Sequence, residues 1–469
     1  MRQRILLVVM TGLALLVPSA AANANSKQFT TVEAPSELLN GSPGDALDEI
    51  QELGADAIRI QVSWRSLAPD ADANKAPSFN ATDPKAYSGW ERYDAAVDGA
   101  RQRGIRVQVT IGGAAPDWAT AKHDGLTRPD ATAFGKFATA VARHFGSKVS
   151  WWSIWNEPNL GKFLKPIAKN ESATVYRNLY LKAYSGLRSG GTRAPILFGE
   201  LAPIGNSLRD IGTIRPLAFL RSALCLDKNY KRAKGKRCAA LPTQGLALHP
   251  YSTGAGPFLV PPADNVTIGV LSRAVQALDK AAKAGAIARR TPIYITEFGV
   301  QSYPDKRVGV PLDVQSDYRS IAEYLAYSNS RVKSFSQYLL RDDGGTGREY
   351  GNFESGLFLN KGRKAKPALQ SFRLPLVVIA NRKSSAKATL WGLVRPGKKA
   401  HRGGTITIEY ADKGKRFKKL ATQRYSSSGY WKRAVATKKN RKFRVVWKAT
   451  DGTTYVGPAT VARSAAPTA

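Results

Sequence analysis

The chain has 469 residues, of which 43% are hydrophobic and 9% aromatic, which is ample for a large buried core. It carries 71 lysines and arginines against 35 acids, a formal net charge of +36, so it should attract polyanions. Its four histidines and two cysteines show no zinc-ligand spacing. We therefore expect no cofactor and no catalytic metal, while a structural calcium ion held by carboxylates stays open.

Residues 1–25 have the pattern of an export signal. Arg2 and Arg4 precede an apolar run from residue 5 to residue 17, and small residues follow it. The run is too short to predict a membrane span, and no other segment approaches about 18 unbroken apolar residues. The sequence thus predicts a secreted protein, extracellular or attached to the cell envelope, with no transmembrane segment after signal cleavage.

Strand and helix patterns alternate through residues 26–374. The expected strands cover residues 29–34, 57–62, 105–111, 151–157, 196–198, 246–248, 292–297 and 334–340. The expected helices cover residues 45–54, 90–104, 134–145, 175–187, 268–284 and 321–326. Eight strand units with helices between them predict a (β/α)8 TIM barrel. An open doubly wound sheet would need a Gly-rich phosphate loop after the first strand, where the sequence has none.

Two of these strands run directly into a glutamate. The stretch 151–159 reaches Glu157 and the stretch 292–299 reaches Glu297, each followed by a turn-forming residue. In a barrel of this kind the C-terminal strand ends form the active-site face. A single strand-end glutamate is more often a surface or capping residue. A pair on one face supplies the proton donor and the nucleophile or base that glycoside hydrolysis requires.

From residue 375 to residue 469 the pattern changes to period-two runs separated by turn signals, which predicts a small antiparallel β-sandwich. Residues 377–469 hold 22 lysines and arginines against three acids, a net charge of +19. Basic runs lie at 413–419 and 438–442. We expect this domain to bind an anionic cell-wall polymer or acidic polysaccharide; the alternative is a solvated domain whose lysines only aid solubility.

Cys225 and Cys238 flank a Lys/Arg-rich segment. In an exported protein a disulfide between them is the preferred interpretation, and a pair of unpaired thiols is the alternative. The bridge is expected to hold a basic insertion beside the cleft, between the fifth and sixth strands.

These motifs carry a family resemblance over residues 29–374. Trp155-Asn156-Glu157-Pro158-Asn159, with Thr296-Glu297-Phe298-Gly299 following 140 residues after the first glutamate, resembles glycoside hydrolase clan A. The first run and the loop 116–119 resemble family 39, whereas the second run and Ile58-Arg59-Ile60 are similar to family 5, the cellulase family.

The resemblance implies roles for individual residues. Glu157 corresponds to the acid/base on the fourth strand and Glu297 to the nucleophile on the seventh. Further matches are Asn156 with the residue that bonds the sugar 2-hydroxyl, Arg59 with the arginine that keeps the nucleophile ionised, and His249 and Tyr251 with sixth-strand residues near the nucleophile. Tyr338 stands where the clan often has Trp, and Gly112-Gly113 where family 5 often has His.

Several of these residues also have a purely structural interpretation. Arg59 would fit a buried ion pair, and His249 would fit the core. Trp64 and Trp118, in loop-like positions, are candidates for stacking on sugar rings, although aromatic residues near strand ends are more often core. Glu200 ends the fifth strand and is a further candidate for lining the cleft.

The sequence as a whole predicts a secreted retaining β-glycosidase acting on a β-linked oligo- or polysaccharide. The rival interpretation is a catalytically silent barrel that binds carbohydrate or the cell envelope and need not place both glutamates at one bond. A nucleic-acid binder is disfavoured, because the sequence contains no recognised nucleic-acid module and begins with an export signal.

Overall fold

The computed structural model describes residues 24–463 except 206–211, 236–237, 345–351, 361, 363, 382–383 and 397–402. The predicted export signal lies outside the described residues, apart from its last two positions. None of the helices in the described ranges is long and apolar enough to cross a bilayer.

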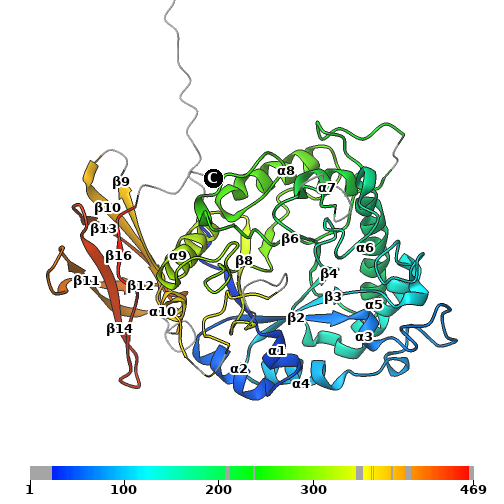
Figure 1. Cartoon of the computed structure of the whole chain (residues 1–469), viewed down its shortest axis with the longest axis horizontal. Helices are drawn as coiled ribbons and strands as arrows, with labels where there is room; N and C mark the ends of the chain where they lie inside the picture. Colours follow the sequence, from blue (N-terminus) through cyan, green and yellow to red (C-terminus); the bar gives the residue numbers. More distant parts are fainter. Residues whose placement is uncertain are drawn as a thin grey trace, which may run out of the picture.

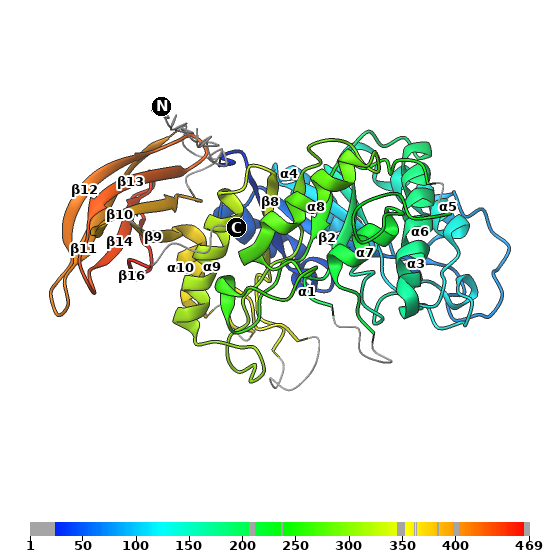
Figure 2. The ribbon, with the colours of Figure 1, turned by 90° about the horizontal axis from the view of Figure 1, so that it is seen from above.

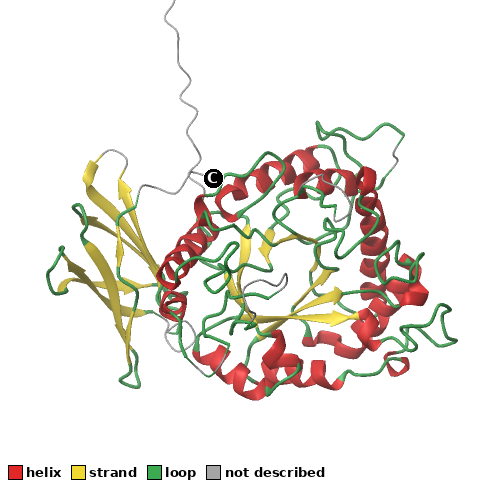
Figure 3. Cartoon of the chain, in the orientation of Figure 1, coloured by secondary structure: helices red, strands yellow, loops and turns green. Residues whose placement is uncertain are grey.

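Eight parallel strands close into a barrel in chain order, and a ring of helices surrounds them (Figures 1 and 3). The predicted (β/α)8 barrel is therefore confirmed. The strands are β1 (Phe29–Glu33), β2 (Ala57–Ser63), β3 (Arg106–Gly112), β4 (Trp151–Ile154), β5 (Ile196–Leu201), β6 (Leu246–Leu248), β7 (Ile293–Ile295) and β8 (Val332–Tyr338).

The helices are amphipathic and several have a clear start signal. Asp130, for example, accepts hydrogen bonds from the first backbone amides of α5. The helices are α1 (Pro35–Leu39), α2 (Pro43–Glu52), α3 (Trp64–Leu67), α4 (Glu91–Gln102), α5 (Ala131–Phe145), α6 (Glu171–Ser189), α7 (Pro216–Ala223), α8 (Leu271–Lys283), α9 (Leu312–Tyr327) and α10 (Pro367–Arg373).

Helix α9 begins well before the predicted residues 321–326. Its first half buries polar side chains, Gln315, Ser316 and Arg319, instead of an apolar stripe. Gln315 Nε2 donates to the Val300 carbonyl at 2.8 Å, so this polar face is satisfied by hydrogen bonds. A search for hydrophobic periodicity therefore finds only the second half of the helix.

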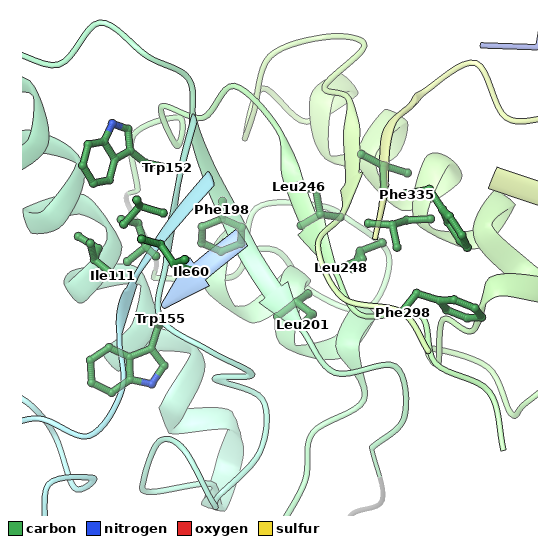
Figure 4. Packing of buried hydrophobic residues seen from close by; sticks show 14 of the residues in the cluster. Ile60, Ile111, Trp152, Trp155, Phe198, Leu201, Leu246, Leu248, Phe298 and Phe335 are labelled. Carbon is green, nitrogen blue, oxygen red and sulfur yellow. The ribbon is translucent and has the colours of Figure 1, made fainter. Parts of the chain in front are cut away.

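The barrel interior has an apolar end and a polar end. Trp151 fills the end at which the strands begin, stacked on Phe29 and packed against Tyr294. Outward-facing apolar residues of neighbouring strands, including Ile60 and Ile111, belong to one continuous buried cluster (Figure 4). The interior positions nearer the strand ends carry polar side chains instead, and these form the site described below.

Two antiparallel sheets follow the barrel, as the period-two pattern predicts. One has the order β13-β10-β9 and the other β12-β11-β14-β15, with β16 beside β14. The strands are β9 (Leu376–Asn381), β10 (Ser384–Leu393), β11 (Gly404–Ala411), β12 (Lys418–Tyr425), β13 (Tyr430–Ala436), β14 (Lys442–Lys448), β15 (Thr454–Val456) and β16 (Thr460–Val461).

The sheets pack on the flank of the barrel beside α9 and α10 (Figure 2). Trp391 of β10 is fully buried and lies 5.2 Å, between ring centroids, from Tyr327 of α9. Arg395 forms a buried ion pair with Glu323 of α9, which also binds Arg319 at 3.0 Å. Buried contacts therefore join the β-sandwich to α9 of the barrel.

Cys225 and Cys238 form a disulfide, as predicted. The expected place beside the cleft is wrong, because the bridge lies in the connection from the end of α7 to the start of β6. Arg232, within the bridged loop, donates to the carbonyl of Gly285, which lies just before β7. Connections that lead into strands lie at the end of a barrel opposite its active-site face, so the bridge supports the base of the barrel.

Replacing both cysteines by serine should lower the free energy of unfolding by up to about 3 kcal/mol, because the bridge closes a short loop. Urea unfolding of the two proteins would measure the difference. Thiol titration of the unreduced, denatured wild type should find no free thiol, and two titratable thiols would refute the bridge.

Candidate active site

Glu157 and Glu297 stand at the same end of the barrel, directly after β4 and β7. The backbone around Glu157 is constrained, with positive φ angles of 67° at Trp155 and 39° at Glu157. The Glu157 amide donates to the Glu200 carbonyl at 2.9 Å, which fixes the turn after β4 against β5. A Cβ at Gly112 would lie 2.7 Å from Trp155 Cα, so this turn also requires the glycine at the end of β3.

The two carboxyl groups face each other across a small gap. One oxygen from each, together with a ring nitrogen of His249, forms a group in which all three atoms lie within 4.8 Å of one another. Both side chains keep limited access to solvent, with exposures of 15% for Glu157 and 12% for Glu297. A single glycosidic bond can therefore reach both carboxyl groups.

Glu297 is held at both oxygens. Arg59 Nη1 donates to Oε1 at 2.8 Å, and the Tyr251 hydroxyl donates to Oε2 at 3.1 Å. The structure thus brings Arg59 and Tyr251 to the carboxylate that the resemblance pairs with them. Two donors in fixed positions hold this carboxylate in one orientation and favour its charged form.

Arg59 is buried and bonded on all sides. Besides Glu297, it donates to Glu33 at 2.6 Å, to Glu200 at 3.1 Å and to the Thr110 hydroxyl at 2.9 Å. Burial opposes its charge, but the three carboxylates raise the pKa of Arg59 well above its ordinary value. The guanidinium is therefore a permanent positive charge inside the barrel.

His249 connects the two candidate catalytic residues to the interior. Its Nδ1 lies 3.0 Å from Glu157 Oε1 and 3.4 Å from Glu297 Oε2, and its Nε2 lies 2.5 Å from Glu200 Oε2. Burial lowers the pKa of His249, but Glu297, Glu157 and Glu200 more than offset this and raise it to about 10. The imidazole is therefore a cation at neutral pH, and both nitrogens donate.

Two buried glutamates beside Arg59 differ in protonation. Burial raises the pKa of Glu33 to about 8, against the pull of Arg59. Burial also acts on Glu200, but Arg59 and His249 together lower its pKa to about 2. At neutral pH Glu200 is charged and Glu33 is largely protonated, because only Glu200 has two cationic partners.

Glu157, His249 and Glu297 also have the donor types that a metal ion requires. Both ring nitrogens of His249 already lie within hydrogen-bond distance of carboxylate oxygens, Nδ1 at 3.0 Å from Glu157 and Nε2 at 2.5 Å from Glu200. The three groups are better described as a hydrogen-bonded acid–base cluster than as a metal centre.

The remaining predicted residues fall into two groups. Asn156 is buried beside Glu157, and its Oδ1 has no hydrogen-bond partner in the described part of the chain. Tyr338 ends β8 and packs at right angles to Tyr251, with ring centroids 6.4 Å apart. Both therefore lie at the cluster, where their contact with a sugar stays a prediction.

Trp64 does not line the site. It is fully buried, stacked on Phe137 of α5, so its predicted role in sugar stacking is replaced by a role in the core. Trp118 packs edge-on against Trp64 and donates from its indole nitrogen to the Pro69 carbonyl at 3.1 Å. The aromatic pair joins the loops after β2 and β3.

The roles of Glu200 and Glu33 were not found from the sequence. Glu200, a candidate for lining the cleft, is completely buried and does not line it. Glu33 is the last residue of β1, whereas Glu157 and Glu297 follow the ends of their strands, and a carboxylate at a strand end was the available signal. Both act on the catalytic pair through Arg59 and His249.

Comparison with known proteins agrees with this geometry. Residues 21–203 match the family model for cellulase, glycosyl hydrolase family 5. The matched residues run from before β1 to the end of β5, so the first half of the barrel is similar to that family. A family 39 glycoside hydrolase from Bacteroides cellulosilyticus WH2 superimposes with a TM-score of 0.55 at 15% identity, over 90% of this chain and 81% of the other.

The curated proteins that match this chain are distant relatives. The beta-glucosidase of Agrobacterium sp. (strain ATCC 21400) is 31% identical over 117 residues, 24% of this chain and 22% of the relative. Probable inactive beta-glucosidase 14 of Oryza sativa subsp. japonica is 27% identical over 136 residues, 26% of this chain and 25% of the relative. The chain thus matches about a quarter of the length of these relatives.

Glu200→Gln should lower the pKa of His249 from about 10 toward its ordinary value of 6.5, because the ring loses a buried anionic partner. In the wild type, His249 stabilises the fold fully below pH 6.5, and this contribution is lost as the pH rises through about 10. Nitrogen-15 NMR of labelled histidine would follow the titration. Glu171→Gln, which removes a surface partner of Arg128, is the matched control, and an unchanged His249 titration in Glu200→Gln would contradict the assignment.

Proposed function

We propose that this protein is an exported retaining β-glycosidase that hydrolyses β-linked oligo- or polysaccharides by double displacement. The observation that carries the proposal is the approach of Glu157 and Glu297, whose nearest oxygens lie within 4.8 Å. Retaining enzymes hold their carboxyl groups about 5–5.5 Å apart, whereas inverting enzymes leave about 6.5–9.5 Å for a water molecule. Oxygens of Glu157 and Glu297 both approach Nδ1 of His249, at 3.0 Å and 3.4 Å, and this close approach favours the retaining arrangement, with direct attack by one carboxylate.

In the first step Glu297 attacks the anomeric carbon while Glu157 gives its proton to the departing glycosidic oxygen. The bond from the anomeric carbon to that oxygen breaks, and a bond to a Glu297 oxygen forms. Arg59 and Tyr251 orient the attacking carboxylate. His249 donates to Glu157 Oε1, which leaves the other carboxyl oxygen of Glu157 to carry the transferred proton.

In the second step Glu157, now a carboxylate, removes a proton from water. The water oxygen attacks the anomeric carbon and releases Glu297, so the sugar keeps its original configuration. The unpaired Oδ1 of Asn156 lies next to Glu157 and would accept a hydrogen bond from a substrate hydroxyl. This supports the expected contact of Asn156 with the sugar.

A silent carbohydrate-binding barrel remains the competing function, since one of the relatives is itself named as inactive. Such a protein has no need for two carboxyl groups that reach one glycosidic bond. It also has no need for a buried cation that contacts the attacking carboxylate. Here Arg59, which is costly to bury, contacts Glu297 directly. This arrangement favours catalysis.

Glu297→Gln should abolish turnover of every substrate, because the nucleophile is lost. Glu157→Gln should reduce hydrolysis of unactivated glycosides about 100- to 10,000-fold but spare the first step with activated aryl β-glycosides, whose leaving groups need little protonation. Glu52→Gln, an exposed change at the end of α2, serves as the control. Wild-type activity of either catalytic variant on an unactivated substrate would refute the assignment, and NMR of the first product would reveal inversion if the mechanism were different.

We further propose that the β-sandwich attaches the protein to an anionic polymer of the cell surface. The turn after β11 and the turn before β14 carry Lys413, Lys415, Lys438 and Lys439, all exposed, which we call the basic turn cluster. Strand pairing of Ala411 with Lys442 brings the two turns together, and Lys438 reaches across to Asp412 at 3.0 Å. The two basic runs therefore form one positively charged edge.

Replacing the four lysines of the basic turn cluster by glutamine should weaken adsorption to insoluble anionic cell-wall material at least about tenfold in 0.1 M salt, because long-range attraction is lost. Adsorption of the wild type should fall as salt rises to 1 M, where the Debye length shrinks from about 10 Å to about 3 Å. Sedimentation of bound protein would measure both effects.

The control carries glutamine at four exposed lysines of the barrel: Lys136, Lys182, Lys283 and Lys333. Substitution is preferable to deletion of the β-sandwich, because Trp391 and Arg395 are buried against α9. Adsorption unchanged by 1 M salt, or equal losses in the cluster and control variants, would discard the attachment role.

A further inference from the structure

A cavity of about 870 Å³ opens at the active-site end of the barrel but is not lined by the catalytic pair. Its walls come from the connections after β3, β4, β5 and β6. We call it the basic cavity. Its lining residues are Lys122, Thr127, Arg128, Gly161, Lys165, Pro166, Ile167, Ala168, Lys169, Asn170, Gly212, Thr213, Ile214, Arg215, Ala218 and Asp264.

The basic cavity is joined to the turn that carries Glu157. The Leu160 amide donates to the Glu157 carbonyl at 2.9 Å, and the next amide, of Gly161, donates to the Gly212 carbonyl at 2.9 Å. The Ile214 amide donates to the Asn159 carbonyl at 2.8 Å. A short hydrogen-bonded path therefore connects the acid/base residue to the cavity wall.

The charge of the basic cavity is strongly positive. Five of its lining residues are lysine or arginine, and Asp264 is the single acid among them. Both oxygens of Asp264 are occupied by Arg221, at 2.7 Å and 2.6 Å. Within the described ranges Lys165 and Arg215 act on Asp124 and Asp264 through charge but form no salt bridge at contact distance, which leaves their donor groups open to a ligand.

The high net charge of the whole protein does not explain the positive charge of the basic cavity. A second cavity, of about 620 Å³, lies beside the ends of β1 and β8. Its described lining contains five carboxylates, from Glu37, Asp45, Glu49, Asp342 and Asp343, and one arginine or lysine, Arg341. The two cavities stand at the same end of one barrel with opposite charge. The positive lining is therefore local to the loops around the acid/base residue.

The chemistry of the two glutamates indicates which part of a substrate meets the basic cavity. The nucleophile bonds the anomeric carbon, and the acid protonates the oxygen that departs with the leaving group. Residues of the loop after β4, which follows Glu157, line the basic cavity, whereas no described residue after β7 or β8 does so. The origin of the lining loops thus favours the leaving-group side for the basic cavity.

We propose that the basic cavity binds an anionic sugar unit, a carboxylate or sulfate ester, on the leaving-group side of the scissile bond, and so selects acidic saccharides as substrates. This proposal rests on the proposed glycosidase function. Lys165 and Arg215 supply the charge-assisted hydrogen bonds. A neutral saccharide would leave these cations without partners, which is the source of the selectivity.

The test uses two matched substitutions. The cavity variant carries Lys165→Gln and Arg215→Gln, and the control variant carries Lys283→Gln and Arg289→Gln, which remove the same charge at exposed positions near the opposite end of the barrel. The probes are a β-1,4-linked glucuronic acid tetramer, cellotetraose as its neutral counterpart, and cellotetraose 6-sulfate. Binding is measured by calorimetry on Glu297→Gln protein with and without each pair of substitutions.

The glucuronic acid tetramer or the sulfated tetramer should bind at least about tenfold more tightly than cellotetraose, and the cavity variant should lose this advantage while the control keeps it. Which acidic probe gains more distinguishes carboxylate from sulfate recognition. Equal binding of the charged and neutral tetramers, no binding of either, or equal loss in the cavity and control variants would overturn the proposal.

Hydrolysis of a 4-nitrophenyl β-glycoside, whose small neutral leaving group makes no charged contact, separates this proposal from the proposed function. The cavity variant should hydrolyse it within about twofold of the wild type, since no catalytic contact changes. Absence of hydrolysis by the wild type would count against the proposed glycosidase function. Calorimetry would still show whether the basic cavity binds acidic saccharides.

Discussion

The burial of Arg59 inside the barrel is the interaction on which the rest of the site depends. Removing a guanidinium from water is costly, and the barrel offsets this cost with carboxylates from three other strand ends, Glu33, Glu200 and Glu297. Removing one partner from such a buried group typically costs about 3–5 kcal/mol. The polar end of the interior is therefore a single assembly of bonded side chains. The position of Glu297 depends on this whole assembly.

This assembly also assigns different tasks to chemically identical side chains. Glu200, between two cations, is a fixed anion, and Glu33, with one cation, is held largely in its neutral form. Glu157 and Glu297 keep partial access to solvent and to a substrate. Environment, not residue type, separates the structural carboxyl groups from those placed for chemistry.

The sequence alone predicts those features that depend on a short, local pattern of residues. The strands follow from short apolar runs, and the catalytic pair follows from strand ends that carry a carboxylate before a turn. The polar half of α9 was hidden because Gln315 and Arg319 are buried through hydrogen bonds. Trp64 was misplaced because a tryptophan after a strand has the same pattern whether it faces a cleft or, as here, the core around Phe137.

Contacts between residues far apart in the chain could not be predicted from the sequence either. The spacing of Cys225 and Cys238 predicts their bridge, but not which end of the barrel it occupies, since that depends on whether the segment leaves a strand or enters one. The role of Glu200 likewise depends on Arg59, 141 residues away in the sequence, and Arg59 in turn binds Glu297, 238 residues away. Such contacts arise from barrel closure, which no local pattern records.

The join between the barrel and the β-sandwich has a mechanical consequence. Two residues separate the end of α10 from the start of β9, and Trp391 and Arg395 anchor the first sheet on α9. A domain on a flexible linker lets an enzyme search a sphere around its attachment point. The short connection and the buried contacts would instead hold the barrel at a fixed orientation to the β-sandwich. The orientation of the cleft over a surface would then be set by the way in which the β-sandwich binds that surface.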